Sequence, residues 1–335
     1  MNPNKFLFST ENPLVNSGDR RGRGSAELEQ LSALLDRAWI ESRSRHGNRL
    51  TVHVPGMFVV NGRRGRYRAI SITGDRCELD CDHCKGSLLR TMPRASDPEI
   101  LLSRGLEAAE RGDFGLLVTG GCDAQGRLPW KGFLGAIRSL KNSTNLTITV
   151  HSGQVDRETA VALKEAGVDQ ALVDVIGDDA TARKVYHLPG GTSTIRRTMD
   201  SLAAAGLEIV PHILFGLYYG IERGEKASLE LLKQYPLKKY VVVVMVPKKG
   251  TPMAGITAPR PERAASFIAS ARLGLPNLQA SLGCAKPRGH YSRELDTLAV
   301  KAGINSLALP SDLALEEARN RGLEVVYKET CCSLG

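Results

Sequence analysis

The sequence YRAISITGDRCELDCDHC, residues 67–84, joins an apolar run to a loop that contains three cysteines. Residues 67–73 form the kind of short, largely apolar run that becomes a buried strand. Cys77, Cys81 and Cys84 follow it directly, in the spacing CxxxCxxC. The N-terminus lacks the apolar segment of a secretory signal, so we expect a reducing, cytoplasmic environment. Thiols in such an environment are more often metal ligands or buried side chains than disulfide partners.

Seven further apolar runs follow along the chain, with helical patterns between them. Strands that are buried on both faces and alternate with helices pair in parallel. Eight such units predict an α/β fold of the (β/α)8, TIM-barrel-like type, with an open doubly wound sheet as the alternative. No Gly-rich dinucleotide motif follows the first run, which favours the barrel. The predicted strands are residues 67–73, 115–119, 146–151, 170–175, 207–213, 239–245, 277–282 and 304–308.

The flanking segments complete the predicted organisation. A polar, Gly/Arg-rich arm precedes apolar residues at helical spacing from residue 25 onward, which predicts a helix. The segments LTVHVPG (50–56) and MFVVNGRRGR (57–66) predict short strands around an Asn-Gly turn. The predicted domains are an arm and helix over 1–45, the barrel over 46–325, and a cysteine-containing tail that covers the barrel mouth over 326–335.

Charge and hydropathy restrict the class of partner. The 335 residues carry a formal net charge of +9, and aromatic residues make up only 5%. No stretch of about 18 apolar residues is present, so we expect no membrane span and no membrane partner. No RNA- or DNA-binding module is recognisable. We therefore expect an acidic protein partner rather than nucleic acid, with an ordinary solvated basic face as the alternative.

Polar groups follow several predicted strands at the end where barrel enzymes place their chemistry. His151 ends the third strand, Asp174 lies near the end of the fourth, and His212 lies in the fifth. Histidines at such positions are more often hydrogen-bonded core residues than catalytic groups. Arg288, after the seventh strand, either orients a substrate or is structural.

The three cysteines at 77, 81 and 84 are compatible with zinc or with an iron–sulfur cluster. Structural zinc needs four ligands, and the local sequence offers only His83, whose position next to Cys84 makes shared coordination awkward. A four-iron cluster held by three thiolates leaves one iron open to a small chelating molecule. The spacing therefore favours a reactive cluster over a structural metal ion.

A CxxxCxxC loop directly after the first strand of a (β/α) barrel resembles the radical S-adenosylmethionine (SAM) superfamily. This resemblance implies that Cys77, Cys81 and Cys84 are catalytic residues that hold a 4Fe-4S cluster and that SAM chelates its open iron. An electron from the cluster then cleaves SAM to a 5′-deoxyadenosyl radical, which abstracts hydrogen from an unactivated C–H bond. The electron donor implied is of the ferredoxin or flavodoxin type.

The resemblance also implies SAM contacts, residue by residue. Thr119–Gly120–Gly121 matches the glycine motif after the second strand, although Cys122 replaces the usual acid. Asp174, Arg196 and Arg197 are equally compatible with ordinary polar positions, and the register of the arginine is uncertain by one residue. The implied SAM-binding residues are His83, Thr119, Gly120, Gly121, Asp174, Arg196, Arg197, Val246 and Pro247.

Four cysteines remain outside the motif: Cys122, Cys284, Cys331 and Cys332. Scattered buried thiols are the simple interpretation. Because Cys122 and Cys284 follow strands and the other two lie in a polar tail, we expect them to form a second iron–sulfur cluster. A vicinal pair does not easily place both sulfurs on one cluster, so Ser333 or the substrate is an alternative ligand.

The stretches SITGDRCELDCDHCKGSLL, LGCAKPRG and CCSLG resemble a biotin-synthase-like group whose members act as paired, two-component lipoyl synthases. That resemblance implies sulfur insertion into an octanoyl chain on an acidic lipoyl-carrier protein, with a second, similar radical SAM chain as partner. The cysteine triplet CxxxxCxxxxxC and the Arg-Ser-Ser motif of single-chain lipoyl synthases are absent. Another biotin-synthase-like enzyme that needs only the first cluster, and a non-enzymatic iron or redox sensor, are the alternatives.

Overall fold

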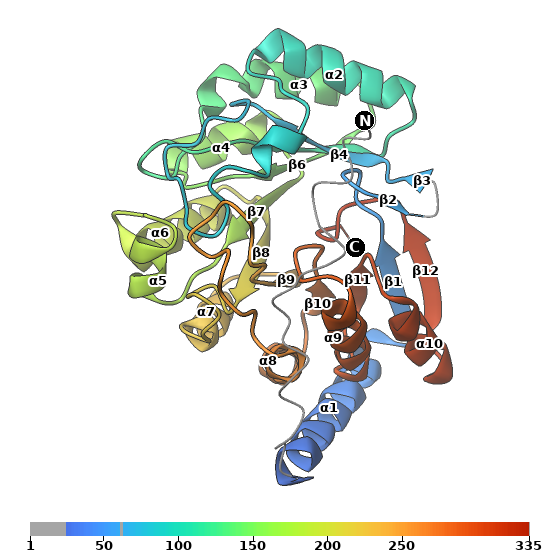
Figure 1. Ribbon diagram of the computed structural model, residues 1–335. Helices are drawn as coiled ribbons and strands as arrows, with labels where there is room; N and C mark the ends of the chain where they lie inside the picture. Colours follow the sequence, from blue (N-terminus) through green and yellow to red (C-terminus); the bar gives the residue numbers. More distant parts are fainter. Residues whose placement is uncertain (1–24, 61–62, 335) are drawn as a thin grey trace.

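The computed structural model describes residues 25–60 and 63–334. Its core is a curled sheet in which ten strands follow the order β12-β1-β11-β10-β9-β8-β7-β6-β5-β4. Each of these strands pairs in parallel with its neighbours. In Figure 1 the sheet curves from β4 round to β12, and the helices lie on its outer side.

All eight predicted strands are present, in consecutive order across the sheet. Their neighbours are joined by crossovers, as expected for alternating strands and helices. The strands are β4 (Tyr67–Ser71), β5 (Gly115–Thr119), β6 (Thr147–His151), β7 (Gln170–Asp174), β8 (Glu208–Phe215), β9 (Lys239–Val244), β10 (Gln279–Leu282) and β11 (Ser306–Ala308).

Two further strands extend the sheet beyond the predicted eight, and the predicted TIM-barrel-like α/β fold is confirmed as a curled half-barrel of ten parallel strands. β1 (Arg49–His53) pairs with both β11 and β12 (Glu324–Lys328), and β4 and β12 are the edges. β12 includes the start of the segment expected as a tail. The edges meet at one point, where the backbone N–H and the guanidinium of Arg66 both bind Glu329.

Several helices begin with an N-cap residue whose side chain accepts a backbone hydrogen bond. Asp97, Asp156, Asp178 and Ser311 cap helices by accepting a hydrogen bond from a backbone N–H with their side chains. The α-helices are α1 (Ser25–His46), α2 (Pro98–Glu110), α3 (Leu134–Ser143), α4 (Arg157–Glu165), α5 (Asp179–Lys184), α6 (Gly191–Ala204), α7 (Glu225–Leu232), α8 (Pro261–Gly274), α9 (His290–Lys301) and α10 (Asp312–Asn320). The described ranges also contain two 3-10 turns, η2 (Leu89–Thr91) and η3 (Trp130–Gly132).

Alternate residues of each strand face opposite sides of the sheet. In β9, Tyr240 and Val242 pack into the large core between the sheet and the helices. Val241 and Val243 belong instead to a second, smaller apolar cluster, with Leu172 of β7 and Val210 of β8. We call the inner side of the curled sheet the lumen, and these residues line it.

The predicted N-terminal helix is present as α1, whereas residues 1–24 of the arm lie outside the described residues. β2 (Val59–Val60) and β3 (Arg63–Arg64) form an antiparallel pair, and the predicted turn at 61–62 is likewise outside the described residues. Within the described ranges, none of the helices has the length and apolar character needed to cross a bilayer.

The expected tail over the mouth is found within the lumen. Cys331 and Cys332 are 9% and 4% exposed and pack against the inner faces of β7, β8 and β9. Their burial is possible because the small and apolar side chains of those strands leave room for a segment of chain. The tail is therefore part of the core that fills the half-barrel.

Candidate active site

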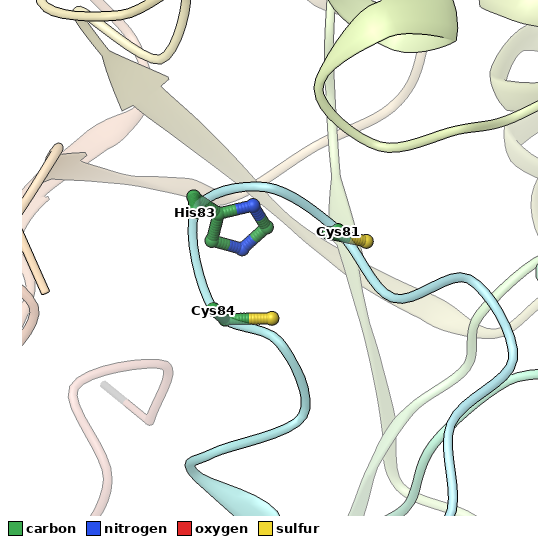
Figure 2. Close-up of side chains that lie close together, drawn as sticks. All are labelled: Cys81, His83 and Cys84. Atoms are coloured by element: carbon green, nitrogen blue, oxygen red, sulfur yellow. The ribbon is translucent and has the colours of Figure 1, made fainter. Parts of the chain in front are cut away.

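The first thiol site is the loop after β4, which carries Cys77, Cys81 and Cys84. The side-chain donor atoms of Cys81, His83 and Cys84 all lie within 4.8 Å of one another. Figure 2 shows the sulfur atoms of Cys81 and Cys84 pointing the same way, with the His83 ring beside them. Cys77 Sγ lies outside this compact group and accepts a hydrogen bond from the backbone N–H of Cys122 at 3.4 Å.

The two glycines after β5 let the neighbouring loop approach the cysteines closely. A Cβ on Gly121 would lie 2.0 Å from the carbonyl oxygen of Arg76 and 2.5 Å from Cys77 Cβ. The Gly121 N–H donates to Thr73 Oγ1 at 2.6 Å, which ties the loop after β5 to the end of β4. Only a residue without a side chain fits at Gly121.

A hydrogen bond joins the thiols of Cys81 and Cys84. The hydrogen bond from the Cys81 thiol lowers the pKa of Cys84 to about 4, with a smaller effect from His83. The same hydrogen bond, together with burial, raises the pKa of Cys81. The hydrogen bond therefore favours the thiolate form of Cys84, which is the form that binds metal.

A second segment of chain, unforeseen from the sequence, clasps the cysteine loop. Tyr186 stacks on His83, with ring centroids 4.8 Å apart, and donates its hydroxyl to Asp174 Oδ2 at 2.7 Å. His187 contacts the carbonyl of Leu79 through Nδ1 at 2.7 Å, and its Nε2 lies 3.2 Å from Asp82 Oδ1.

The clasp requires strained backbone. Tyr219 also donates to Asp82, and both His187 and Tyr219 have positive φ angles, of 55° and 50°. Such angles in bulky residues are uncommon and are held by surrounding contacts. The only hint in the sequence is the aromatic and Gly/Pro-rich character of the segments around 186–191 and 217–220, which alone does not predict contact with the cysteines.

The predicted SAM contacts fall into two groups. Thr119 ends β5 next to Gly120 and Gly121, and Asp174 ends β7 and is bound to Tyr186, which stacks on His83. Val246 and Pro247 follow β9 at the same rim and are half-buried. These residues lie at the strand ends on the same rim as the first thiol site, and their contact with SAM stays a prediction.

The two predicted arginines lie elsewhere. Arg196 and Arg197 are exposed on α6, where Arg196 donates to Gln234 and Arg197 donates to Ser193 and Thr194. Helical geometry turns this part of α6 away from the sheet, because Ile195 and Thr198 occupy its buried face. The expectation that either arginine contacts SAM is therefore not supported by its position.

Cys122 was expected in the second cysteine set, but it lies at the first site. Its backbone contacts Cys77 Sγ, and its carbonyl accepts from Glu78 N at 2.7 Å. Burial and the nearby charge of Cys77 raise the pKa of the Cys122 thiol. The cause is strand order: β5 adjoins β4, whereas four strands, β6 to β9, separate it from β10.

The other three cysteines form a second thiol site in the lumen. A hydrogen bond with the Cys332 thiol lowers the pKa of Cys284 and lowers that of Cys331 to about 6. The shared hydrogen bonds raise the pKa of Cys332 itself. The thiols of the vicinal Cys331 and Cys332 are thus hydrogen-bonded to each other, and Ser333 contributes a hydroxyl beside Cys331.

Cations surround the loop that carries Cys284. Arg288 donates to the Cys284 carbonyl at 2.8 Å. Lys286 and Asp296 form an ion pair of 3.1 Å in which neither side chain is exposed. Lys286 also donates to the Ala308 carbonyl at 2.7 Å, which links the loop after β10 to the end of β11.

Two histidines face each other within the lumen. The rings of His151 and His212 are 5.5 Å apart, and burial lowers the pKa of His212 to about 4, so that it is neutral at pH 7. His151 is close enough to Cys331 to contribute to the lowered pKa of that thiol, and Asp174 is close enough to His212 to oppose the fall in its pKa. The pair therefore lies between the two thiol sites.

The donors at the first site suit an iron–sulfur cluster. One loop carries three cysteines, of which Cys81 and Cys84 lie close together, and the described cysteines form no disulfide. The glycine cradle at Gly121 brings backbone N–H groups to the edge of the site, and such groups stabilise bound sulfur ligands. A parallel α/β half-barrel with this loop after β4 defines an enzyme of the iron–sulfur class.

Comparison with known proteins identifies the family. A sequence model described as "Radical SAM superfamily" matches residues 71–242, just over half of the chain. The chain therefore belongs to the radical SAM superfamily, and it is a radical SAM enzyme of the biotin-synthase-like group. Its cofactors are accordingly a 4Fe-4S cluster and SAM, and Cys77, Cys81 and Cys84 are the residues that would hold the cluster.

Individual relatives agree with this placement. The biotin synthase of Pelotomaculum thermopropionicum is 27% identical over 305 residues, which cover 88% of this chain and 88% of that protein. The solved structure of methylornithine synthase (PylB) matches with a TM-score of 0.62 and 16% identity, over 89% of this chain and 90% of that one. The solved structure of HydG, a maturase of the [FeFe]-hydrogenase, matches with a TM-score of 0.64 and 15% identity, over 91% of this chain and 70% of that one. At such identities the structures show a common fold alone.

Proposed function

We propose that the protein inserts sulfur into unactivated C–H bonds of an octanoyl chain on a lipoyl-carrier protein, as one component of a two-component lipoyl synthase. The sulfur would come from a second iron–sulfur cluster. Membership of the biotin-synthase-like group and the likeness to a biotin synthase favour an enzyme that forms C–S bonds. The resemblance of the CxxxCxxC, LGCAKPRG and CCSLG stretches to the paired lipoyl synthases supports the particular substrate.

The observation that carries the proposal is the second thiol site. Cys331 and Cys332 are buried among lumen side chains, and the partly buried Cys284 packs against them, separate from the first site. Three thiols with Ser333 beside them offer a full set of cluster ligands, or leave one position for the substrate. An enzyme that used only the first cluster would gain nothing from assembling these thiols inside the half-barrel.

The remaining residues of the lumen suit radical chemistry. When bound, the first cluster and SAM supply a carbon radical that removes a hydrogen atom from a C–H bond with no acidic proton. Gly120 and Gly121 bring the backbone of the loop after β5 against the cysteine loop, where it would contact the amino group of SAM, and Asp174 presents a carboxylate that accepts a hydrogen bond from Tyr186. The apolar residues of β7, β8 and β9 exclude water from the space between the two sites.

The proposed partners follow from charge and from family. The net charge of +9 favours association with an acidic carrier protein. A second, similar radical SAM chain would complete the pair, and a ferredoxin- or flavodoxin-type protein would supply electrons. The alternative is another biotin-synthase-like radical SAM enzyme, for C–S bond formation or cofactor maturation, in which only the first cluster is essential.

Iron counting and cysteine substitution test the proposal. After anaerobic reconstitution we expect about eight irons per chain, against about four for the alternative. In Cys284→Ser and Cys331→Ser variants, an octanoyl-lysyl peptide assay with the partner chain should show no sulfur transfer. The same variants should still form 5′-deoxyadenosine, which serves as an internal control for the first site. Product formed at the normal rate by the double variant would contradict the proposal.

A further inference from the structure

Lys239 is a buried cation inside the lumen. It is the first residue of β9, and the alternation that points Val241 and Val243 inward points Lys239 inward as well. Its exposure is only 5%. A lysine at such a position has to find hydrogen-bond acceptors, because an unpaired ammonium group is costly to bury.

The acceptors of Lys239 come from the tail. Its Nζ donates to the carbonyl oxygen of Leu334 at 2.7 Å and to that of Cys332 at 3.4 Å. Among the residues that the structure describes, no carboxylate forms an ion pair with Lys239, since the nearby Glu208 binds Lys238 instead. The tail backbone is therefore what solvates this charge.

Neighbouring strands hold the same stretch of backbone. Ser281 of β10 donates to the Cys332 carbonyl at 3.3 Å, so that this carbonyl accepts hydrogen bonds from side chains of both β9 and β10. Upstream, His53 at the end of β1 contacts Thr330 Oγ1 at 3.1 Å. Between these anchors lie Cys331 and Cys332, and the Cys332 thiol is hydrogen-bonded to the thiols of both Cys284 and Cys331.

We propose that Lys239 is a positioning residue that docks the tail in the lumen and thereby assembles Cys331 and Cys332 with Cys284. The step from docking to cluster assembly rests on the proposed function, whereas the docking itself does not. Lys239 lies at the N-terminal end of β9, whereas the active-site loop follows its C-terminal end. Its Nζ donates to carbonyl groups of the tail rather than to a sulfur. Its effect on the thiol site would therefore act through the position of the tail.

The test compares Lys239→Met with the matched control Lys238→Met. Lys238 is the adjacent residue, but it is exposed and pairs with Glu208 at 2.7 Å. In the metal-free protein, alkylation of Cys331 and Cys332 measured by mass spectrometry should be about tenfold faster or more in Lys239→Met, because charged hydrogen bonds that hold the tail are lost. Lys238→Met should match the wild type.

Iron content gives the second readout. After reconstitution, Lys239→Met should retain about four irons where the wild type holds about eight. Ser281→Ala removes the other side-chain hydrogen bond to the Cys332 carbonyl and should also speed alkylation of Cys331 and Cys332, by a smaller factor than Lys239→Met. If Lys239→Met fails to fold, Lys239→Gln carries the same expectation.

The possible outcomes separate the two proposals. Equal alkylation rates in Lys239→Met, or in its Gln substitute, and in the wild type would overturn the docking role. Faster alkylation together with an unchanged iron content would overturn the link between docking and cluster assembly. A wild type with only about four irons would refute the proposed second cluster, and the alkylation rates would still decide the docking role.

Discussion

Gly121 shows how one residue governs the first thiol site. Its N–H binds Thr73, and its missing side chain leaves room for the backbone of Arg76 and the Cβ of Cys77. Any side chain at this position would collide with the backbone of Arg76 and with Cys77, and neither can move away without displacing the cysteine loop. The position of Cys77 therefore depends on this glycine.

Gly121→Ala should displace the loop that carries Cys77, because its Cβ would fall 2.0 Å from a backbone oxygen. We expect loss of iron from the first site and at least about a hundredfold less 5′-deoxyadenosine, since misplacement by about 1 Å is that costly in an active site. Iron analysis and product quantification measure the two effects.

The control for this substitution is Gly135→Ala in α3, where a Cβ meets nothing within 4 Å. That change should keep the full iron content and should slightly stabilise the helix. Normal iron content in Gly121→Ala would show that the loop adapts to the extra carbon.

At the scale of elements, the buried Lys286–Asp296 pair connects the loop after β10 with α9 and α10. Asp296 belongs to α9, and its Oδ2 accepts from the Ser311 N–H that precedes α10. The same loop carries Cys284. The second thiol site thus rests on a polar link between three segments as well as on apolar packing.

Asp296→Asn should lower the free energy of unfolding by about 3–5 kcal/mol, because it leaves the fully buried ammonium of Lys286 without its counter-charge. Denaturation in urea measures this loss. Glu41→Gln, which breaks the exposed pair of Glu41 with Arg45 in α1, should cost less than about 0.5 kcal/mol. A similar loss in both variants would mean that the buried pair contributes no more than a surface pair.

At the scale of the whole molecule, the positive net charge predicts how salt affects the reaction. For an acidic carrier domain as substrate, KM should rise about tenfold between about 50 and 300 mM salt, since ions screen attraction between surface charges. A short, neutral octanoyl-lysyl peptide should show no such rise. Steady-state kinetics with both substrates provide the measurement, and an equal salt response would contradict a role for charge in carrier binding.

Much of this architecture was predictable because it depends on local patterns. The apolar runs marked all eight strands from β4 to β11, and the spacing of Cys77, Cys81 and Cys84 marked the first site. β12 was missed because its residues are only half-buried, with an exposed Tyr327, and form no continuous apolar run.

The assignment of the other cysteines needed three-dimensional information. Cys122 and Cys284 both follow strands, and only the order of strands in the sheet separates them. The depth of the tail depends on Lys239, nearly a hundred residues away in sequence, and a lysine at a strand start predicts an exposed side chain rather than an anchor. The clasp by Tyr186 and His187 depends likewise on distant contacts.

The place of Cys331 and Cys332 in the chain also sets the order of events during biosynthesis. The ribosome makes them after every strand of the half-barrel, and polypeptides fold from the N-terminal side as they emerge. The CxxxCxxC loop is therefore available for metal loading well before the vicinal pair exists. If the lumen thiols bind the proposed second cluster, a cell that supplies iron and sulfide during translation would load the first thiol site before the lumen site.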